Sequence, residues 1–310
     1  MRGRILIAGG TGFIGSHVVE AALRMGLEVV ALTHTRGNFS HSFPGAEHAR
    51  ILRADLSDRA GLKELLGGES FDYAVNCAGS IDHTLFSKGG RAVIEGHLFG
   101  LMNLVAALDR GQLKGFAQLG SSDECGGASA PQRETLREAP ISPYSFAKAA
   151  GTHFLEMLHR SEGFPAVVLR LFLTYGPGQN DQRFIPQIVK GCMANSAFPV
   201  SAGEQLRDFC YVADIARGVL DALACPAAMG RTIHLASGVP VSIRAFIERI
   251  RARLGKGRPE FGRIAYRPGE NMALHADTTL ARELLGWHPE VSLEEGLERT
   301  IAWISAGASG

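Results

Sequence analysis

The stretch that decides the fold is ILIAGGTGFIGSHVVE, residues 5–20. It begins as a short apolar run, continues as a glycine-rich turn and ends with the apolar spacing of an amphipathic helix. This order predicts a buried strand, a tight turn and a helix that stops near Gly26, because glycine is the preferred residue just past a helix end. Within the turn, Gly9, Gly12 and Gly15 have the spacing GxxGxxG.

Glycines at this point have a chemical use. Without side chains they permit a tight turn and let a pyrophosphate approach the backbone N–H groups at the helix N-terminus. Glycines that serve only a turn are the alternative, but the preceding strand and following helix favour a dinucleotide site. The predicted pyrophosphate-binding residues are Gly9, Gly12, Phe13, Ile14 and Gly15.

The same alternation of strand and helix continues along the first half of the chain. Further apolar runs that predict strands lie at 28–32, 49–56, 71–79, 115–122 and 166–172. Helical patterns separate most of them, including a long one near 91–110. Strands that alternate with helices predict an α/β fold with a doubly wound parallel sheet, known as a Rossmann fold.

The alternation breaks after about residue 175, where loops marked by glycine and proline begin. Helices are predicted near 213–224, 243–254 and 292–304, the last opened by the capping box SLEE. We therefore expect a cofactor-binding domain at 1–175 and a smaller, interleaved substrate-binding region at 176–310. Segments at about 205–237 are expected to return to the first domain.

The net charge and the cysteine content limit which binding partners and which compartment we expect. The chain has 310 residues, 45% of them hydrophobic, and a formal net charge of +1. A charge so near zero gives no broad attraction to nucleic acid or to an acidic membrane surface. Five cysteines without a CxxC pair favour a reduced cytoplasmic protein, and we predict no metal site and no membrane partner.

The end of the second strand bears on which cofactor binds. An acidic residue there would bind the adenosine ribose hydroxyls of NAD, but this chain has Thr33, followed by His34, Thr35 and Arg36. Hydroxyl groups and a guanidinium suit the 2′-phosphate of NADP, because arginine binds phosphate through two hydrogen bonds. The sequence favours NADP, with NAD as the alternative.

The stretch YSFAK, residues 144–148, places Tyr144 and Lys148 on one face of a helix that begins with Ser142 as N-cap and Pro143. A tyrosine acts as an acid or base near neutral pH only if its pKa of about 10 falls by about 3 units, and a nearby ammonium favours that. The apolar stripe expected to face the core is Phe146, Ala150, Phe154, Met157 and Leu158.

Together, the ordered motifs GGTGFIG, GSS, YxxxK, YGPGQ, RDFCYVAD and RPGE resemble those of the extended short-chain dehydrogenase/reductase superfamily. More narrowly, the chain is similar to the nucleotide-sugar epimerase/dehydratase/reductase family over nearly all of its length. The resemblance implies that Tyr144 is the catalytic acid/base and that Lys148 lowers its pKa and binds the nicotinamide ribose. Ser122 would orient the reacting oxygen of the substrate, with Ser121 as the competing register.

Other positions follow from the same resemblance. It implies that Asp55 and Leu56 flank the adenine and that Ala78 and Gly79 line the cofactor. Arg207 and Arg267 would bind the diphosphate of a nucleoside-diphosphate sugar. The chain departs from the family at Cys125, His97 and Leu173, where a tyrosine and two asparagines are common, so the substrate pose is the least transferable part.

In the family that the chain resembles, three reactions use a serine, a Tyr–Lys pair and a nicotinamide cofactor. The GSSDECG segment, residues 120–126, most resembles a pattern of 4-keto reductases, which favours an NADPH-dependent reductase. A 4-epimerase that retains NAD is the second reading. A 4,6-dehydratase is the third, with Asp123 and Glu124 as its added acid and base. A cofactor-binding protein without catalysis is a remote alternative.

The long helix near 91–110 also predicts an assembly. It is apolar over more than one face, so covering the sheet leaves apolar surface for another partner. In the family that the chain resembles, this helix and the YxxxK helix pair with their copies across a two-fold axis. We therefore predict a homodimer.

Overall fold

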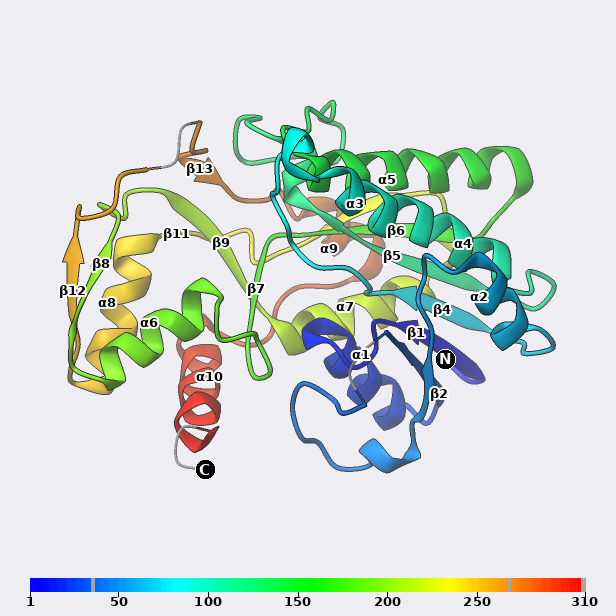
Figure 1. Cartoon of the computed structure of the whole chain (residues 1–310), viewed down its shortest axis with the longest axis horizontal. Helices are drawn as coiled ribbons and strands as arrows, with labels where there is room; N and C mark the ends of the chain where they lie inside the picture. Colours follow the sequence, from blue (N-terminus) through cyan, green and yellow to red (C-terminus); the bar gives the residue numbers. More distant parts are fainter. Residues whose placement is uncertain (35–36, 267–268, 308–310) are drawn as a thin grey trace.

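The computed structural model describes residues 1–34, 37–266 and 269–307. Among these residues, the main sheet has seven strands, all parallel, in the order β10-β6-β5-β4-β1-β2-β3 (Figure 1). They are β1 (Arg4–Ala8), β2 (Glu28–Thr33), β3 (Arg50–Arg53), β4 (Tyr73–Asn76), β5 (Gly115–Ser121), β6 (Ala166–Leu171) and β10 (Thr232–Leu235). The strand order reverses between β1 and β4, so the prediction of a doubly wound sheet is confirmed.

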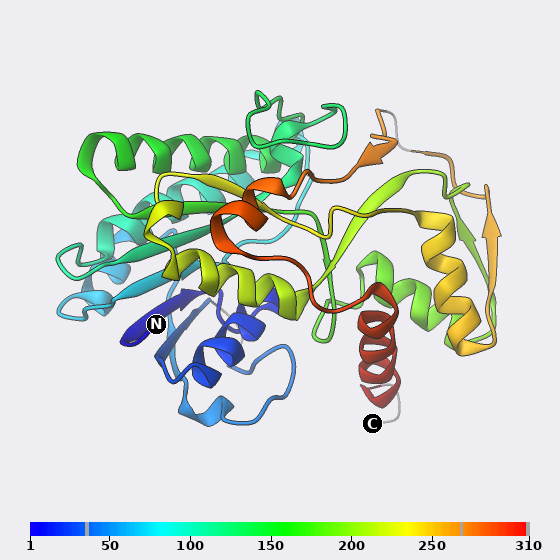
Figure 2. The same ribbon diagram turned by 180° about the vertical axis from the view of Figure 1, so that it is seen from behind.

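Helices cover both faces of this sheet because the side chains of each strand alternate between two cores. In β1, Ile5 and Ile7 lie in one core, whereas Leu6 and Ala8 lie in the other. The first core lies under α1 (Phe13–Arg24), α7 (Val212–Ala224) and α9 (Thr279–Leu285), which Figure 2 shows in front of the sheet. The second lies under α2 (Arg59–Leu66), α4 (Gly100–Ala107) and α5 (Pro143–Glu162). Before α4, the helix α3 (Arg91–Ile94) and the π-helical segment η3 (Glu95–Phe99) pack against α5.

A smaller region lies beside the carboxyl ends of the main strands (Figure 1). Its strands are β7 (Leu173–Tyr175), β9 (Leu206–Tyr211), β11 (Pro240–Ser242) and β13 (Ala273–Leu274), with the separate pair β8 (Ala197–Val200) and β12 (Arg258–Phe261). Its helices are α6 (Phe184–Met193), α8 (Ile243–Leu254) and α10 (Leu293–Gly307). After β9 the chain leaves this region, covers one face of the main sheet with α7 and adds β10 at the edge of that sheet. It then returns to the smaller region at β11. The division into 1–175 and 176–310 stays a prediction.

The remaining short helical turns are η1 (Ala46–His48), η2 (Phe86–Lys88), η4 (Ser122–Cys125) and η5 (Pro226–Ala228). Over the ranges that the structure describes, no helix has the length and apolar character needed to span a bilayer.

The expected orientation of α5 is wrong. Phe146 is 48% exposed and Met157 is 44% exposed, and of the predicted core stripe only Leu158 is fully buried. The helix instead turns Tyr144 and Ala147 toward the sheet. Apolar spacing identified a real stripe, but a helix with two apolar faces does not reveal from sequence which face meets the sheet.

Candidate active site

The glycine-rich turn forms a tight cradle at the N-terminus of α1. Gly9 has a φ of 72°, and a Cβ atom built on it would lie 2.8 Å from the Cα of Ala78. A Cβ atom on Gly15 would lie 2.1 Å from the carbonyl oxygen of Gly9. Side chains are therefore excluded at both positions, and the helix N-terminus stays open to an anion, as a dinucleotide pyrophosphate requires.

A groove of about 200 Å³ continues from this cradle along the carboxyl ends of β1, β2 and β4. It brings together six of the predicted cofactor-binding residues: Gly9, Gly12, Thr33, Leu56, Ala78 and Gly79. Asp55 lies next to the groove, where its Oδ2 is 3.5 Å from Nε2 of His34. A backbone hydrogen bond from Ser57 holds the pKa of Asp55 below its usual value.

The end of the groove beside β2, where the adenosine ribose was predicted to bind, has a pair of hydroxyl groups in place of an acid. Thr33 is buried, and its Oγ1 lies 2.7 Å from Oγ1 of Thr11. Arg36 lies outside the described residues. A second cation was missed in the sequence: a Cβ atom on Gly37 would lie 3.2 Å from Nη2 of the exposed Arg53, so this guanidinium lies beside the segment that follows β2.

Tyr144 and Lys148 share one face of α5, as their spacing predicts. Ser142 caps the helix by accepting a hydrogen bond from Ser145 N, and Pro143 follows it. Nζ of Lys148 donates a 2.9 Å hydrogen bond to the carbonyl of Leu119 in β5 and lies 5.8 Å from the centre of the Tyr144 ring. The helix thus presents both side chains to the end of the strand that carries the serines.

Burial dominates the protonation of this pair. Burial lowers the pKa of Lys148 to about 8, although the carboxylate of Glu124 opposes that change. Burial also raises the pKa of Tyr144, which a hydrogen bond from the Ser121 side chain opposes. The protein alone therefore keeps the phenol neutral, which is the form that can donate a proton.

Of the two candidate serines, Ser121 is the one whose side chain hydrogen-bonds Tyr144. Ser121 is the last residue of β5 and its side chain forms the hydrogen bond that lowers the tyrosine pKa. Ser122 begins the 3-10 turn η4 and is only 4% exposed. A one-residue change in register at a strand end reverses the direction of a side chain, so the two registers place different hydroxyls toward a substrate. The assignment of Ser122, with Ser121 as the competing register, stays a prediction.

Two histidines flank the tyrosine, and the sequence identified neither as part of the site. The ring centres of His97 and His83 lie 5.2 and 5.6 Å from that of Tyr144, both edge to face. Nε2 of His97 lies 2.9 Å from the carbonyl of Ser80, and burial lowers its pKa to about 4. His97 is thus neutral near pH 7. The departure from asparagine at position 97 was the signal that could have drawn attention to it.

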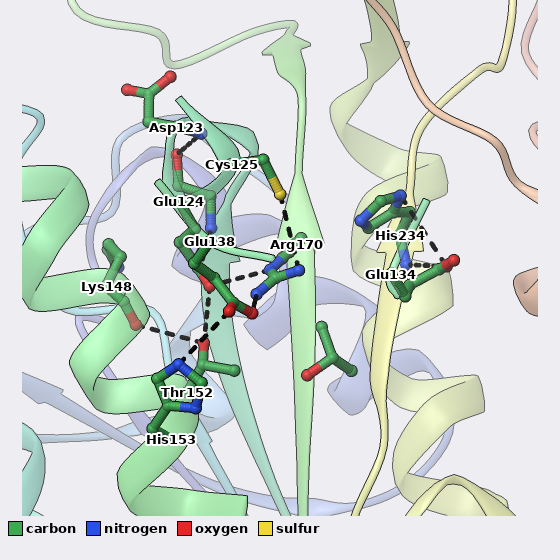
Figure 3. Close-up of polar contacts among 12 residues, drawn as sticks. Asp123, Glu124, Cys125, Glu134, Glu138, Lys148, Thr152, His153, Arg170 and His234 are labelled. Carbon is green, nitrogen blue, oxygen red and sulfur yellow. Dashed lines mark hydrogen bonds and ion pairs between the residues drawn. The ribbon is translucent and has the colours of Figure 1, made fainter. Parts of the chain in front are cut away.

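The two acids of the GSSDECG segment point in different directions. Asp123 is near the site, with Oδ2 4.0 Å from Nε2 of His83, and burial raises its pKa. The side chain of Glu124 is fully buried and accepts hydrogen bonds from Ser121 N, Thr152 and Arg170 (Figure 3). Three protein donors therefore bind this buried carboxylate, which disfavours a role for Glu124 as a base that meets the substrate.

Of the two arginines predicted to bind the diphosphate, the structure describes one. Arg207 lies in β9, and its Nη1 donates 2.8 Å hydrogen bonds to the carbonyls of Leu206 and Asn271, while Nη2 pairs with Glu270. Arg267 lies outside the described residues. One of its nitrogens thus already pairs with a carboxylate, and the diphosphate-binding role of Arg207 stays a prediction.

Comparison with known proteins defines the class. The model of the NAD dependent epimerase/dehydratase family matches residues 5–236. A dTDP-glucose 4,6-dehydratase from Streptomyces niveus is 30% identical over 97% of this chain and 92% of its own. The UDP-glucuronic acid 4-epimerase of Bacillus cereus, solved in complex with UDP-glucuronic acid and NAD, has a TM-score of 0.88 and 28% identity, covering 98% of this chain and 99% of its own.

These matches extend over the glycine cradle, the serine strand end and the Tyr–Lys helix alike. The chain belongs to the NAD dependent epimerase/dehydratase family, as its motifs implied, and it is an enzyme of that family.

Proposed function

We propose that the protein is an NADP(H)-dependent reductase of a nucleoside-diphosphate 4-keto sugar. The substrate class follows from its relatives, which are named for dTDP-glucose and UDP-glucuronate. The observation that supports the reductive direction is the buried Tyr144, which burial keeps neutral and which lies on the same helix face as Lys148. A neutral phenol is the proton donor that reduction of a ketone needs.

The roles of the residues follow from this geometry. When bound, NADPH supplies the hydride that reaches C4 of the sugar. Tyr144 donates its proton to O4 as the C–O double bond becomes single, and it is reprotonated from solvent. Lys148 binds the nicotinamide ribose and stabilises the phenolate through its charge. Ser121 donates a hydrogen bond to O4 and so orients the carbonyl.

The glycine cradle of Gly9, Gly12 and Gly15 would bind the pyrophosphate of the cofactor, with Phe13 and Ile14 at the start of α1 supplying backbone N–H groups. We also propose that Arg207 and Arg267 bind the diphosphate of the sugar nucleotide. Binding energy from this charged group would then position a weakly held sugar against Tyr144.

A 4-epimerase is the second candidate, because the match to the UDP-glucuronic acid 4-epimerase covers nearly all of both chains. Epimerisation needs Tyr144 first as a base and then as an acid, with NAD retained between the two steps. A 4,6-dehydratase is less well supported despite the dehydratase relatives, because Glu124 is committed to Arg170 and Thr152.

The test is a direct assay of purified protein. With dTDP-4-keto-6-deoxyglucose as a representative substrate, NADPH absorbance should fall, and mass spectrometry should find a product heavier by two hydrogens. The same protein incubated with UDP-glucuronate or dTDP-glucose and NAD should return them unchanged. Epimerised UDP-glucuronate with tightly bound NAD would replace the reductase by the epimerase, and formation of a 4-keto-6-deoxy sugar would indicate a dehydratase.

Cofactor choice can be tested at two arginines, Arg36 after β2 and Arg53 at the end of β3. Arg36→Ala and Arg53→Ala should each weaken NADPH binding by ten- to a hundredfold, since a charge-assisted contact contributes roughly 1.5–3 kcal/mol. NADH affinity should change less than about twofold. Arg50→Ala is the matched control, because Arg50 lies on the same strand but pairs with Glu69 at 2.8 Å. Fluorescence titration of both cofactors measures this, and equal affinities that neither variant alters would exclude a 2′-phosphate site.

We also propose that the enzyme is a homodimer through α4 and α5. Four large apolar side chains remain exposed on the face formed by η3, α4 and α5: Phe99, Met102, Phe146 and Met157. Exposed apolar side chains that gather on neighbouring helices are typical of surfaces that bind another protein. Two of these side chains, Phe146 and Met157, were expected in the core and would instead pack against a second copy of the chain.

Light scattering should therefore give twice the 33.1 kDa mass of the chain. Phe146→Glu should give the monomer mass, because a carboxylate buried in an apolar interface has no partner. Val239→Glu is the control, since Val239 is 62% exposed but lies before β11 in the smaller region. A wild-type mass of one chain at micromolar concentration would rule out the dimer.

A further inference from the structure

Glu124 is a buried carboxylate next to the site that accepts three hydrogen bonds from the protein. Its side chain is fully buried, and Oε1 accepts a 2.8 Å hydrogen bond from the backbone N of Ser121. Oε2 accepts from Oγ1 of Thr152 at 2.8 Å and from Nε of Arg170 at 2.9 Å (Figure 3). These partners lie on three different elements, so one carboxylate connects the end of β5, the helix α5 and the strand β6.

Two of these elements carry the proposed chemistry. Ser121 ends β5, and Thr152 lies one turn beyond Lys148 on α5, where its hydroxyl also approaches the carbonyl of Lys148 at 3.2 Å. Two further polar contacts join the same two elements at reacting residues. They are the 2.9 Å hydrogen bond from Lys148 to the carbonyl of Leu119 and the hydrogen bond between the side chains of Ser121 and Tyr144. Glu124 therefore helps to set the separation between Ser121 and the Tyr–Lys face.

The charges of the cluster do not balance without Lys148. Arg170 has no exposed surface and pairs with both Glu124 and Glu138, the latter at 2.5 Å from Nη2. Glu138 is 18% exposed and has His153 3.4 Å away near the surface. Glu124 has no access to water, and its charge opposes the burial-induced fall in the Lys148 pKa.

Stability alone does not explain a buried pair of this kind. Replacing buried ion pairs by apolar side chains of similar size is often neutral or stabilising. A carboxylate kept at this position, bonded to a backbone N–H of the serine strand and to the Tyr–Lys helix, is better explained by what it positions.

We propose that Glu124 is a positioning residue for the reaction, which fixes Ser121 against the Tyr144–Lys148 helix and provides the buried negative charge that Lys148 faces. The proposal rests on the proposed function for its catalytic meaning. The other groups that face Lys148 are the Cys77 thiol after β4, the imidazole of His97 from η3 and Tyr144 on its own helix. Burial raises the Cys77 pKa to about 12, so that thiol is uncharged near neutral pH.

Two glutamates on the same arginine allow a matched comparison. Glu124→Gln and Glu138→Gln each remove one carboxylate from Arg170, but only the first touches Ser121 and Thr152. If Glu124 only paired with Arg170 and did not act on Lys148, both variants would lose stability and neither would alter the titration of Lys148. A positioning role predicts that Glu124→Gln alone lowers the Lys148 pKa, because removing a nearby negative charge disfavours the ammonium form.

The experiment is NMR titration of protein labelled with ¹⁵N-lysine, with the Lys148 signal assigned by its loss in Lys148→Met. We expect the Lys148 pKa to fall by about one unit in Glu124→Gln and to stay within about 0.2 units of wild type in Glu138→Gln. This readout needs no substrate, so it can fail while the reductase assay succeeds, and the reverse. Equal shifts in both variants, or no shift in either, would overturn the proposal.

A second pair of variants covers the case in which Glu124→Gln does not fold. Thr152→Val removes the hydroxyl that Glu124 accepts from, at nearly constant volume, and Thr152→Ser retains it. We expect turnover to fall about three- to tenfold in Thr152→Val, with an unchanged KM for the sugar nucleotide, and to return toward wild type in Thr152→Ser. Wild-type turnover in Thr152→Val would contradict the positioning role.

Discussion

Tyr144→Phe is expected to lower turnover of the nucleotide sugar by a factor of about 10² to 10⁴, in line with the usual contribution of general acid catalysis. The variant keeps the ring, whose edge contacts with His83 and His97 should hold it in place. Only the hydroxyl that donates the proton is lost. NADPH affinity should therefore remain within about threefold of wild type when measured by fluorescence titration.

The serine register provides the control for this result. Ser121→Ala should lower turnover by about ten- to a hundredfold, because Ser121 is the residue whose side chain bonds to the tyrosine. Ser122→Ala should change it less than about threefold. Turnover near wild type in Tyr144→Phe would remove the catalytic assignment, and a larger loss in Ser122→Ala than in Ser121→Ala would assign the orienting role to Ser122.

Arg170→Met is expected to cost about 3–5 kcal/mol of folding free energy, the largest effect on stability that we predict. Arg170 is fully buried and pairs with both Glu124 and Glu138, so its loss leaves Glu124 charged and without a counterion. For a chain of this size each kcal/mol shifts the melting temperature by roughly 2–4 °C, which predicts a fall of roughly 6–20 °C. Thermal unfolding followed by circular dichroism measures it.

Two further variants show whether the unpaired charge of Glu124 causes this loss of stability. The double variant Arg170→Met with Glu124→Gln should recover part of the loss, because the uncompensated carboxylate is then gone. Arg160→Met on the exposed side of α5, where Arg160 pairs with Glu156 at 3.5 Å, should change stability by less than about 0.5 kcal/mol. A double variant less stable than Arg170→Met would show that packing, and not charge, dominates at this position.

Much of the fold could be predicted because its signals are local. The glycine spacing at 9–15, the apolar strands and the caps at Ser142 and Ser292 all act within a few residues, and the structure has the strands and helices where they were expected. The spacing of Tyr144 and Lys148 is also a local matter, since residues four apart on a helix share a face.

Other features needed the folded chain, because they depend on partners far away in sequence or on packing direction. Which apolar face of α5 meets the sheet is set by its neighbours in the second core, so Phe146 lies outside despite its periodicity. The choice between Ser121 and Ser122 depends on where β5 ends and η4 begins. Helical period and strand alternation define faces, but they do not say what each face meets.

The buried charges give the clearest example of what the sequence could predict and what needed the folded chain. From sequence, Glu124 was a candidate base beside a serine, and Arg207 was a free cation for a diphosphate. Glu124 pairs with Arg170, 46 positions further along the chain, and Arg207 pairs with Glu270, 63 positions further along. The sequence alone determined the class of fold, the cofactor cradle and the Tyr–Lys pair, because hydrogen bonding and side-chain spacing within one element specify them. Only the tertiary structure decided which acids and cations are free for chemistry, because a buried charge takes whichever opposite charge the packing of distant elements brings to it.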